Sequence, residues 1–116
     1  MVSERDGCDA LARVFEERGY ALARDVPLEL EDVQFTADGW DGSARVGFEY
    51  LTHAAGDHLD LTEAELARLG AMMERGEISL LLVDEHEVDT VEDLTWAAHR
   101  FLDEVERRKA TRSAIP

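Results

Sequence analysis

Apolar and polar residues alternate along the stretch VQFTADGWDGSARVGFEYL, from Val33 to Leu51. A period of two is typical of a β-strand with one buried face, because successive side chains point to opposite sides of a sheet. The centre of the stretch, DGWDGS at 38–43, is rich in Asp and Gly, which favour tight turns. The stretch therefore predicts a β-hairpin, and it limits the fold more than any other part of the chain.

The alternation also predicts how the two strands of this hairpin pair. A register that brings three apolar pairs onto one face joins Ala37 with Ala44, Phe35 with Val46, and Val33 with Phe48. The same register places Asp32 opposite Glu49 on the other face. We therefore expect these two carboxylates to lie close together.

A further strand precedes the hairpin, and its apolar residues share one parity. They are Tyr20, Leu22, Val26, Leu28 and Leu30. The parity changes at Val33, which predicts a two-residue turn at Glu31 and Asp32. Pro27 has no N–H for a ladder, so it predicts that this strand lies at an edge or contains a bulge.

Helical spacing predicts three helices around these strands. They cover Ser3 to Arg18, a segment capped by Thr62 and Glu65 that runs to about Arg75, and a segment capped by Thr90 and Asp93 that runs to about Arg108. The stretch from Ile78 to Val83, which is apolar apart from Ser79, predicts a strand covered on both faces. The expected buried stripe of the last helix consists of Val91, Leu94, Ala98, Phe101 and Val105.

The order of these elements is α-β-β-β-α-β-α, which predicts one α/β (α+β) domain over residues 1–116. Its four-stranded mixed sheet contains an antiparallel meander and has helices packed on it. The expected core spans about 8–105. A basic C-terminal tail of about 107–116 follows, with Arg107, Arg108, Lys109 and Arg112.

The chain is strongly acidic, with 27 Asp and Glu against 12 Lys and Arg, for a net charge of −15. Nucleic acid and anionic membranes carry the same sign of charge, so we expect direct binding to neither. The charge favours a basic protein partner, a cation, or mimicry of DNA. Cys8 is the single cysteine, which excludes an intramolecular disulfide and fits a cytoplasmic protein. The charged N-terminus has no apolar segment typical of a signal peptide.

The element order resembles the PD-(D/E)XK nuclease-like superfamily. In that family an Asp near the start of the second strand and a Glu on the third hold Mg²⁺, and a Lys two residues after the Glu assists the attacking water. Asp32 and Glu49 stand at the two acidic positions, with sixteen residues between them. Leu51 replaces the Lys, and Glu31 stands where the family has Pro, so the resemblance implies a degenerate member.

Each candidate site has a structural explanation beside the functional one. Asp32 and Glu49 either chelate a metal or face solvent on an open sheet face. Trp40 and Asp41, at the tip of the hairpin, either contact a partner or complete a tight turn, with Trp40 folded onto the core. The four histidines, His53, His58, His86 and His99, lack the helical spacing of a zinc motif. Cys8 lies on the apolar face of the first helix, where it is expected to be buried.

These observations favour a small acidic, non-catalytic interaction or regulatory protein that binds a protein partner. One alternative is a phosphodiesterase of the nuclease-like class that uses Asp32, Glu49 and a divalent metal. A second alternative is a DNA-mimic inhibitor. No cofactor is expected, except Mg²⁺ if the nuclease-like alternative holds. A homodimer formed through Trp40 or a free sheet edge also stays open.

Overall fold

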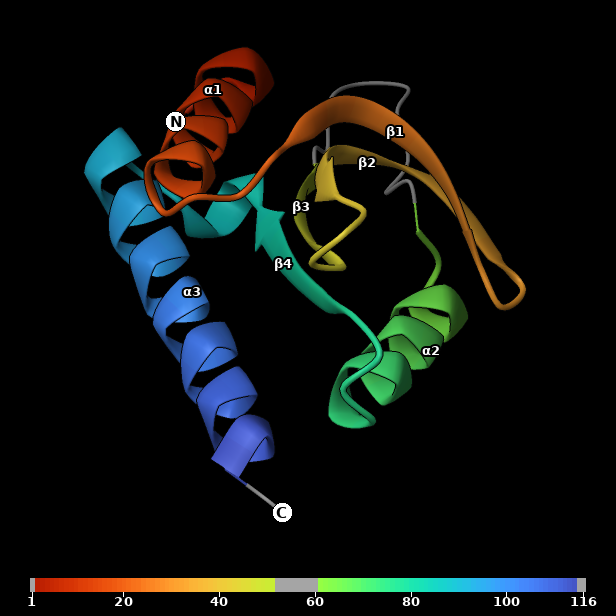
Figure 1. Ribbon diagram of the computed structural model, residues 1–116. Coiled ribbons are helices and arrows are strands. Elements are labelled where there is room, and N and C mark those ends of the chain that lie inside the picture. The colour runs from red at the N-terminus through yellow and green to blue at the C-terminus, as the bar shows by residue number, and fades with distance from the viewer. Residues whose placement is uncertain (1, 52–60, 115–116) are drawn as a thin grey trace.

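The computed structural model describes residues 2–51 and 61–114. Figure 1 labels its helices and strands, which are α1 (Glu4–Glu17), β1 (Ala23–Leu30), β2 (Val33–Asp41), β3 (Val46–Leu51), α2 (Glu63–Glu74), β4 (Ser79–Asp84) and α3 (Val91–Ala114). A short 3₁₀ helix, η1 (Glu85–Glu87), joins β4 to α3. The strand order is β1-β2-β3-β4; β1, β2 and β3 form an antiparallel meander, and β3 and β4 are parallel. The predicted α+β fold and element order are confirmed.

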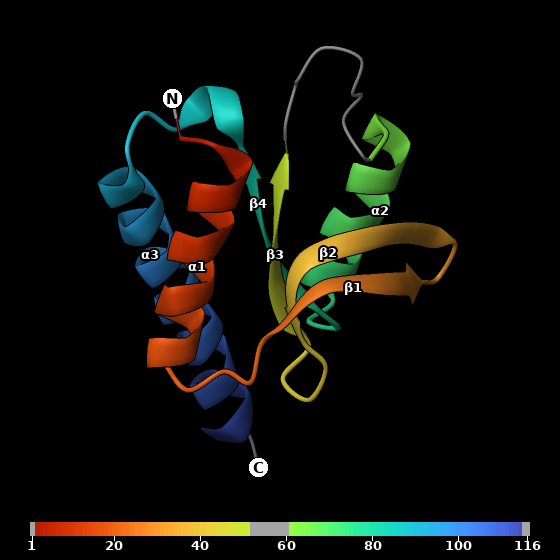
Figure 2. The same cartoon turned by 90° about the horizontal axis from the view of Figure 1, so that it is seen from above.

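The sheet lies between two layers of helix. Figure 2 shows α1 and α3 on one face and α2 on the other. The residues of the first interface include Leu11, Phe15, Phe48, Tyr50, Leu94 and Leu102. The residues of the second include Val33, Ala37, Trp40, Leu61, Leu69 and Leu80. Each face of the sheet therefore has its own apolar core, which explains why the four central residues of β4, Leu80 to Val83, are all apolar.

The predicted helix N-termini are confirmed by their hydrogen bonds. The Ser3 hydroxyl accepts from the Asp6 N–H at 3.1 Å. Thr62 and Glu65 form a complete capping box, in which each side chain accepts from the other residue's backbone N–H. The Thr90 hydroxyl likewise accepts from the Asp93 N–H at 3.1 Å. These contacts satisfy backbone donors that the first turn of a helix leaves without a partner.

The predicted pairing of β2 with β3 is wrong. The observed pairs are Gly39 with Phe48, Trp40 with Gly47, and Asp41 with Val46. The strand therefore continues through residues 38–41, which the sequence had suggested as part of the turn. The reason is steric: a Cβ at Gly39 would overlap the Phe48 ring, and a Cβ at Gly47 would overlap the Gly39 carbonyl oxygen. The two glycines allow a close strand contact that an alternating pattern does not reveal.

The turn at Glu31 and Asp32 is confirmed, and Glu31 adopts the left-handed conformation with φ of 56°. Pro27 lies in β1, an edge strand, as predicted. Two predictions about α3 are wrong. The helix continues to Ala114, so most of the expected basic tail is helical. Val91 is 41% exposed rather than part of the buried stripe.

Candidate functional site

Asp32 and Glu49, the predicted metal ligands, lie in different surroundings. Asp32 is exposed in the turn between β1 and β2, where its carboxylate lies 3.5 Å from the Arg68 guanidinium. Glu49 lies within β3 and is only 1% exposed. The expected register, which placed Asp32 opposite Glu49, is wrong. Metal binding by the two residues was predicted from that register and loses its geometric basis.

Asp38 takes the place next to Glu49 that Asp32 was expected to have. The last observed β2–β3 pair is Gly39 with Phe48, and the next residue along each strand is Asp38 and Glu49. Both are buried. One Asp38 oxygen accepts a hydrogen bond from the Tyr50 N–H at 2.7 Å, so the side chain reaches across to β3. The structure thus brings two acidic residues of adjacent strands into a buried region.

Cys8 of α1 is buried, as predicted, and the charges of these carboxylates act on its thiol. Burial, followed by the negative charge of Asp38, raises the pKa of the Cys8 thiol far above its ordinary value. Glu4 and Glu49 act in the same direction, whereas Arg24 acts against them. The thiol therefore stays protonated at neutral pH and behaves as a small apolar side chain. Within residues 2–51 and 61–114, no group of three or more His, Cys, Asp or Glu side chains is arranged to hold a metal ion.

Trp40 and Asp41 have structural roles at the end of β2. Trp40 is 7% exposed and packs in the core on the α2 side, which was the expected alternative to partner contact. The Asp41 carboxylate accepts from the backbone N–H groups of Ala21, Ser43 and Ala44, at 2.9, 3.0 and 3.0 Å. Binding of a partner through Trp40 and Asp41 would require this region to open, and it stays a prediction.

The histidines divide into two groups. His53 and His58 lie outside the described residues. His86 belongs to η1, and His99 lies on α3, where its Nδ1 is 3.2 Å from an Arg18 nitrogen. Because a guanidinium only donates, Nδ1 is the acceptor in this contact.

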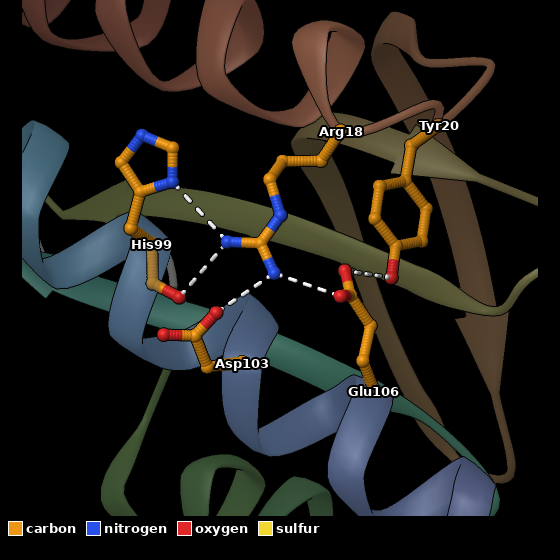
Figure 3. Close-up of polar contacts among 5 residues, drawn as sticks. All are labelled: Arg18, Tyr20, His99, Asp103 and Glu106. Atoms are coloured by element: carbon orange, nitrogen blue, oxygen red, sulfur yellow. Dashed lines mark hydrogen bonds and ion pairs between the residues drawn. The ribbon is translucent and has the colours of Figure 1, made fainter.

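Arg18 joins α1 to α3 through a cluster that the sequence analysis missed (Figure 3). Its guanidinium donates to the His99 carbonyl at 3.3 Å and to the carboxylates of Asp103 and Glu106, both at 2.8 Å. The hydrogen bond with Glu106 is the main cause of the raised pKa of Arg18. The Tyr20 hydroxyl also donates to Glu106, at 3.5 Å. His99, Asp103 and Glu106 are three or four residues apart, and this helical spacing was the available signal.

Trp96 was also missed, and it is the most exposed large apolar residue that the structure describes. Its exposed fraction is 64%. The Arg100 guanidinium, one turn further along α3, lies 5.0 Å from the centroid of its ring. Glu92 and Asp93 precede Trp96 by four and three residues, so they lie on the same side of the helix. Both are exposed, as are Glu87 and Asp89 in the preceding segment. An exposed aromatic residue thus follows a series of exposed acidic residues at the start of α3.

No family model matches the chain, and neither a curated protein nor a solved structure matches it. In the described part of the chain, every helix is too short or too polar to cross a bilayer. The functional argument therefore rests on the residues themselves.

Proposed function

We propose that this protein is a non-catalytic interaction protein that binds a basic protein partner through the α3 surface around Trp96. The observation that carries the proposal is the 64% exposure of Trp96, one helical turn after the exposed Glu92 and Asp93, with Glu87 and Asp89 exposed in the segment that leads into α3. We call this surface the Trp96 surface and define it by Glu87, Asp89, Glu92, Asp93 and Trp96. It combines an apolar anchor with charges that attract Lys and Arg.

An exposed tryptophan has physical properties that suit a binding anchor. It offers a large apolar area and loses little conformational entropy when it is buried, and tryptophan is enriched among the residues that contribute most to interfaces. Arg100 lies over the ring and limits its motion before binding. The Trp96 side chain is therefore partly ordered in the free protein, which lowers the cost of association.

The charge of the whole protein supports the same class of partner. A net charge of −15 attracts a basic partner at long range and accelerates its association. The acidic residues beside Trp96 then act at short range, where salt screens them less. Binding should therefore depend on salt through its rate and on Trp96 through its affinity.

The fluorescence of Trp96 provides a direct test. Trp40→Phe leaves Trp96 as the single tryptophan, and its emission can be followed while short peptides are added. A peptide of Lys and Leu should bind more tightly than a peptide of the same charge made of Lys, Gly and Ser, because only the first offers apolar contact to the ring. In a label-based assay, Trp96→Ala should weaken binding by about tenfold or more.

Matched charge variants distinguish binding at the Trp96 surface from attraction by the net charge of the whole protein. The double variant Glu87→Gln with Glu92→Gln removes two charges from the surface. The control, Glu16→Gln with Glu17→Gln, removes two exposed charges from the end of α1. Equal weakening by both pairs, together with unchanged affinity in Trp96→Ala, would show that the peptides bind without a defined site and would refute the proposal.

The buried pair Asp38 and Glu49 favours a second candidate function, a divalent-metal-dependent phosphodiesterase of the nuclease-like class. Carboxylate oxygens suit Mg²⁺ or Mn²⁺, and the two residues occupy adjacent strands, as the resemblance implies. Leu51 replaces the Lys that would assist water attack. The two carboxylates thus suit a bound ion, but without the Lys they do not form a complete catalytic set. This function therefore ranks second.

Thermal unfolding tests this candidate directly. If Mg²⁺ or Mn²⁺ binds the folded state, it must raise the melting temperature above the value in NaCl of equal ionic strength. Glu49→Gln, which keeps the size of the side chain, should abolish that difference, whereas Asp32→Asn should not. Equal melting temperatures in MgCl₂, MnCl₂ and NaCl for the unmodified chain would eliminate the second candidate.

A further inference from the structure

Strand β4 forms one edge of the sheet, with β3 on its other side. The Ser79 N–H donates to the Arg45 carbonyl at 2.9 Å, at the start of the parallel ladder with β3. The backbone N–H and C=O groups of successive residues point alternately to one side of the strand and to the other. The backbone groups of Leu80 and Leu82 are therefore directed away from β3, toward the open edge.

Met73 covers the first of these edge groups. The Leu80 N–H donates to the Met73 sulfur at 3.4 Å. A thioether is a weak acceptor, whereas a backbone carbonyl is a strong one. An incoming strand could replace the sulfur with a carbonyl and gain a better hydrogen bond. The flexible side chain of Met73 can move aside at small cost.

A groove lies beside the start of β4 at Ser79, between the end of α2 and the second half of α3. Figure 1 shows these two helices on either side of β4. One hollow of about 250 Å³ has Met73, Phe101 and Val105 as its apolar lining. An adjoining hollow extends over the start of β4 to Arg45 and Lys109. The groove therefore offers apolar contacts beside an open row of backbone donors and acceptors.

The groove is more basic than the rest of the protein. Its cations are Arg45, Arg107, Arg108 and Lys109, four of the 12 in the chain. Three acids, Glu74, Glu77 and Glu104, share the lining, so the cations exceed the acids by one. The carboxylate of Glu104 accepts from both Arg107 and Arg108. Arg45 donates through Nε to the neutral carbonyl of Glu77, at 2.8 Å. The lining therefore retains positive charge in a protein of net charge −15.

We propose that this groove binds an extended acidic segment of a partner protein, which adds to β4 as the next strand of the sheet. Backbone hydrogen bonds to Leu80 and Leu82 would provide affinity, and the cations would select acidic side chains. The site differs in residues and in charge from the Trp96 surface, so it does not depend on the function proposed above.

Amide hydrogen exchange followed by NMR tests strand addition. The probe is a short acetylated peptide in which Glu and Val alternate, and the control peptide alternates Lys and Val. The Glu–Val peptide should slow exchange at Leu80 and Leu82, because their N–H groups point to the new strand. The N–H groups of Leu81 and Val83 point to β3 and should change little. The Met73 methyl signal should shift in the same titration.

Charge variants test the selection of an acidic segment. Arg108→Gln with Lys109→Gln should weaken binding of the Glu–Val peptide by roughly tenfold. The control Arg5→Gln with Arg13→Gln removes two exposed cations from α1 and should leave binding unchanged. Circular dichroism spectra that match the unmodified chain establish that each variant is folded.

Three results would overturn the proposal. The first is unchanged exchange at Leu80 and Leu82 when the peptide is present at about 1 mM. The second is equal protection by the Lys–Val peptide, which would contradict the acidic preference. The third is protection of the same two amides without peptide, together with a dimer in sedimentation equilibrium. That result would identify a second copy of this chain as the occupant of the edge.

Discussion

Asp41 determines the shape of the loop between β2 and β3. Its carboxylate accepts three backbone hydrogen bonds, two from the loop residues Ser43 and Ala44 and one from Ala21 before β1. The bond from Ala44 is the main reason that the pKa of Asp41 lies below its usual value, and burial opposes the shift. The residue that the sequence suggested as a partner contact therefore joins three segments of its own chain.

The stability supplied by Asp41 should depend on pH. A carboxylate with a lowered pKa stabilises the folded state fully above its unfolded pKa, and this contribution disappears as the pH falls through the folded pKa. Asp41→Asn removes the charge and turns a donor toward the Ala21 N–H. At pH 7 we expect a loss of about 1–3 kcal/mol in the free energy of unfolding, measured with urea.

This loss should shrink as the pH falls from about 4.5 toward about 2.5, because the carboxyl of the unmodified chain then becomes neutral too. Asp89→Asn is the matched control, since Asp89 is an exposed acid in a different segment. It should change stability by less than about 0.5 kcal/mol at either pH. An Asp41→Asn penalty that is the same at pH 7 and at about pH 2.5 would contradict the electrostatic explanation.

At the scale of elements, features that depend on residues close in the sequence were predictable. Contacts between residues far apart in the sequence were not. The caps at Ser3, Thr62 and Thr90 were predictable because donor and acceptor lie three residues apart. The β2–β3 register was not, since it depends on Gly39 fitting under the Phe48 ring. An Asp-Gly sequence is more typical of a turn than of a strand interior. The loop was therefore predicted at 38–43, whereas β2 continues to Asp41.

The wrong β2–β3 register also led to the wrong choice of a candidate site residue. Glu49 was correctly predicted to lie on the second strand of the hairpin, but the changed register exchanges Asp32 for Asp38 as its neighbour. Trp96 was predictable in principle. The buried residues Leu94, Ala98, Leu102 and Val105 form the stripe of α3, and position 96 falls outside it. A tryptophan outside the apolar stripe of an amphipathic helix is a signal of surface function.

At the scale of the whole molecule, the net charge of −15 opposes folding. Repulsion among like charges is stronger in the compact state than in the extended chain, and salt screens it. The ion pairs on the described surface, such as those of Arg24 with Asp9 and Arg68 with Asp32, are exposed, so salt removes little stability from them. The repulsion should therefore dominate the response to salt.

We expect the melting temperature to rise by several degrees when NaCl increases from about 0.02 M to about 0.3 M at pH 7. Glu17 sharpens the test because it lies at the C-terminal end of α1, where the helix dipole disfavours an acid. Glu17→Gln should raise the melting temperature by roughly 2 °C at the lower salt and by less at the higher. Differential scanning calorimetry measures both effects. A melting temperature that falls with added NaCl would show that attractive pairs, rather than net repulsion, dominate the electrostatics of this fold.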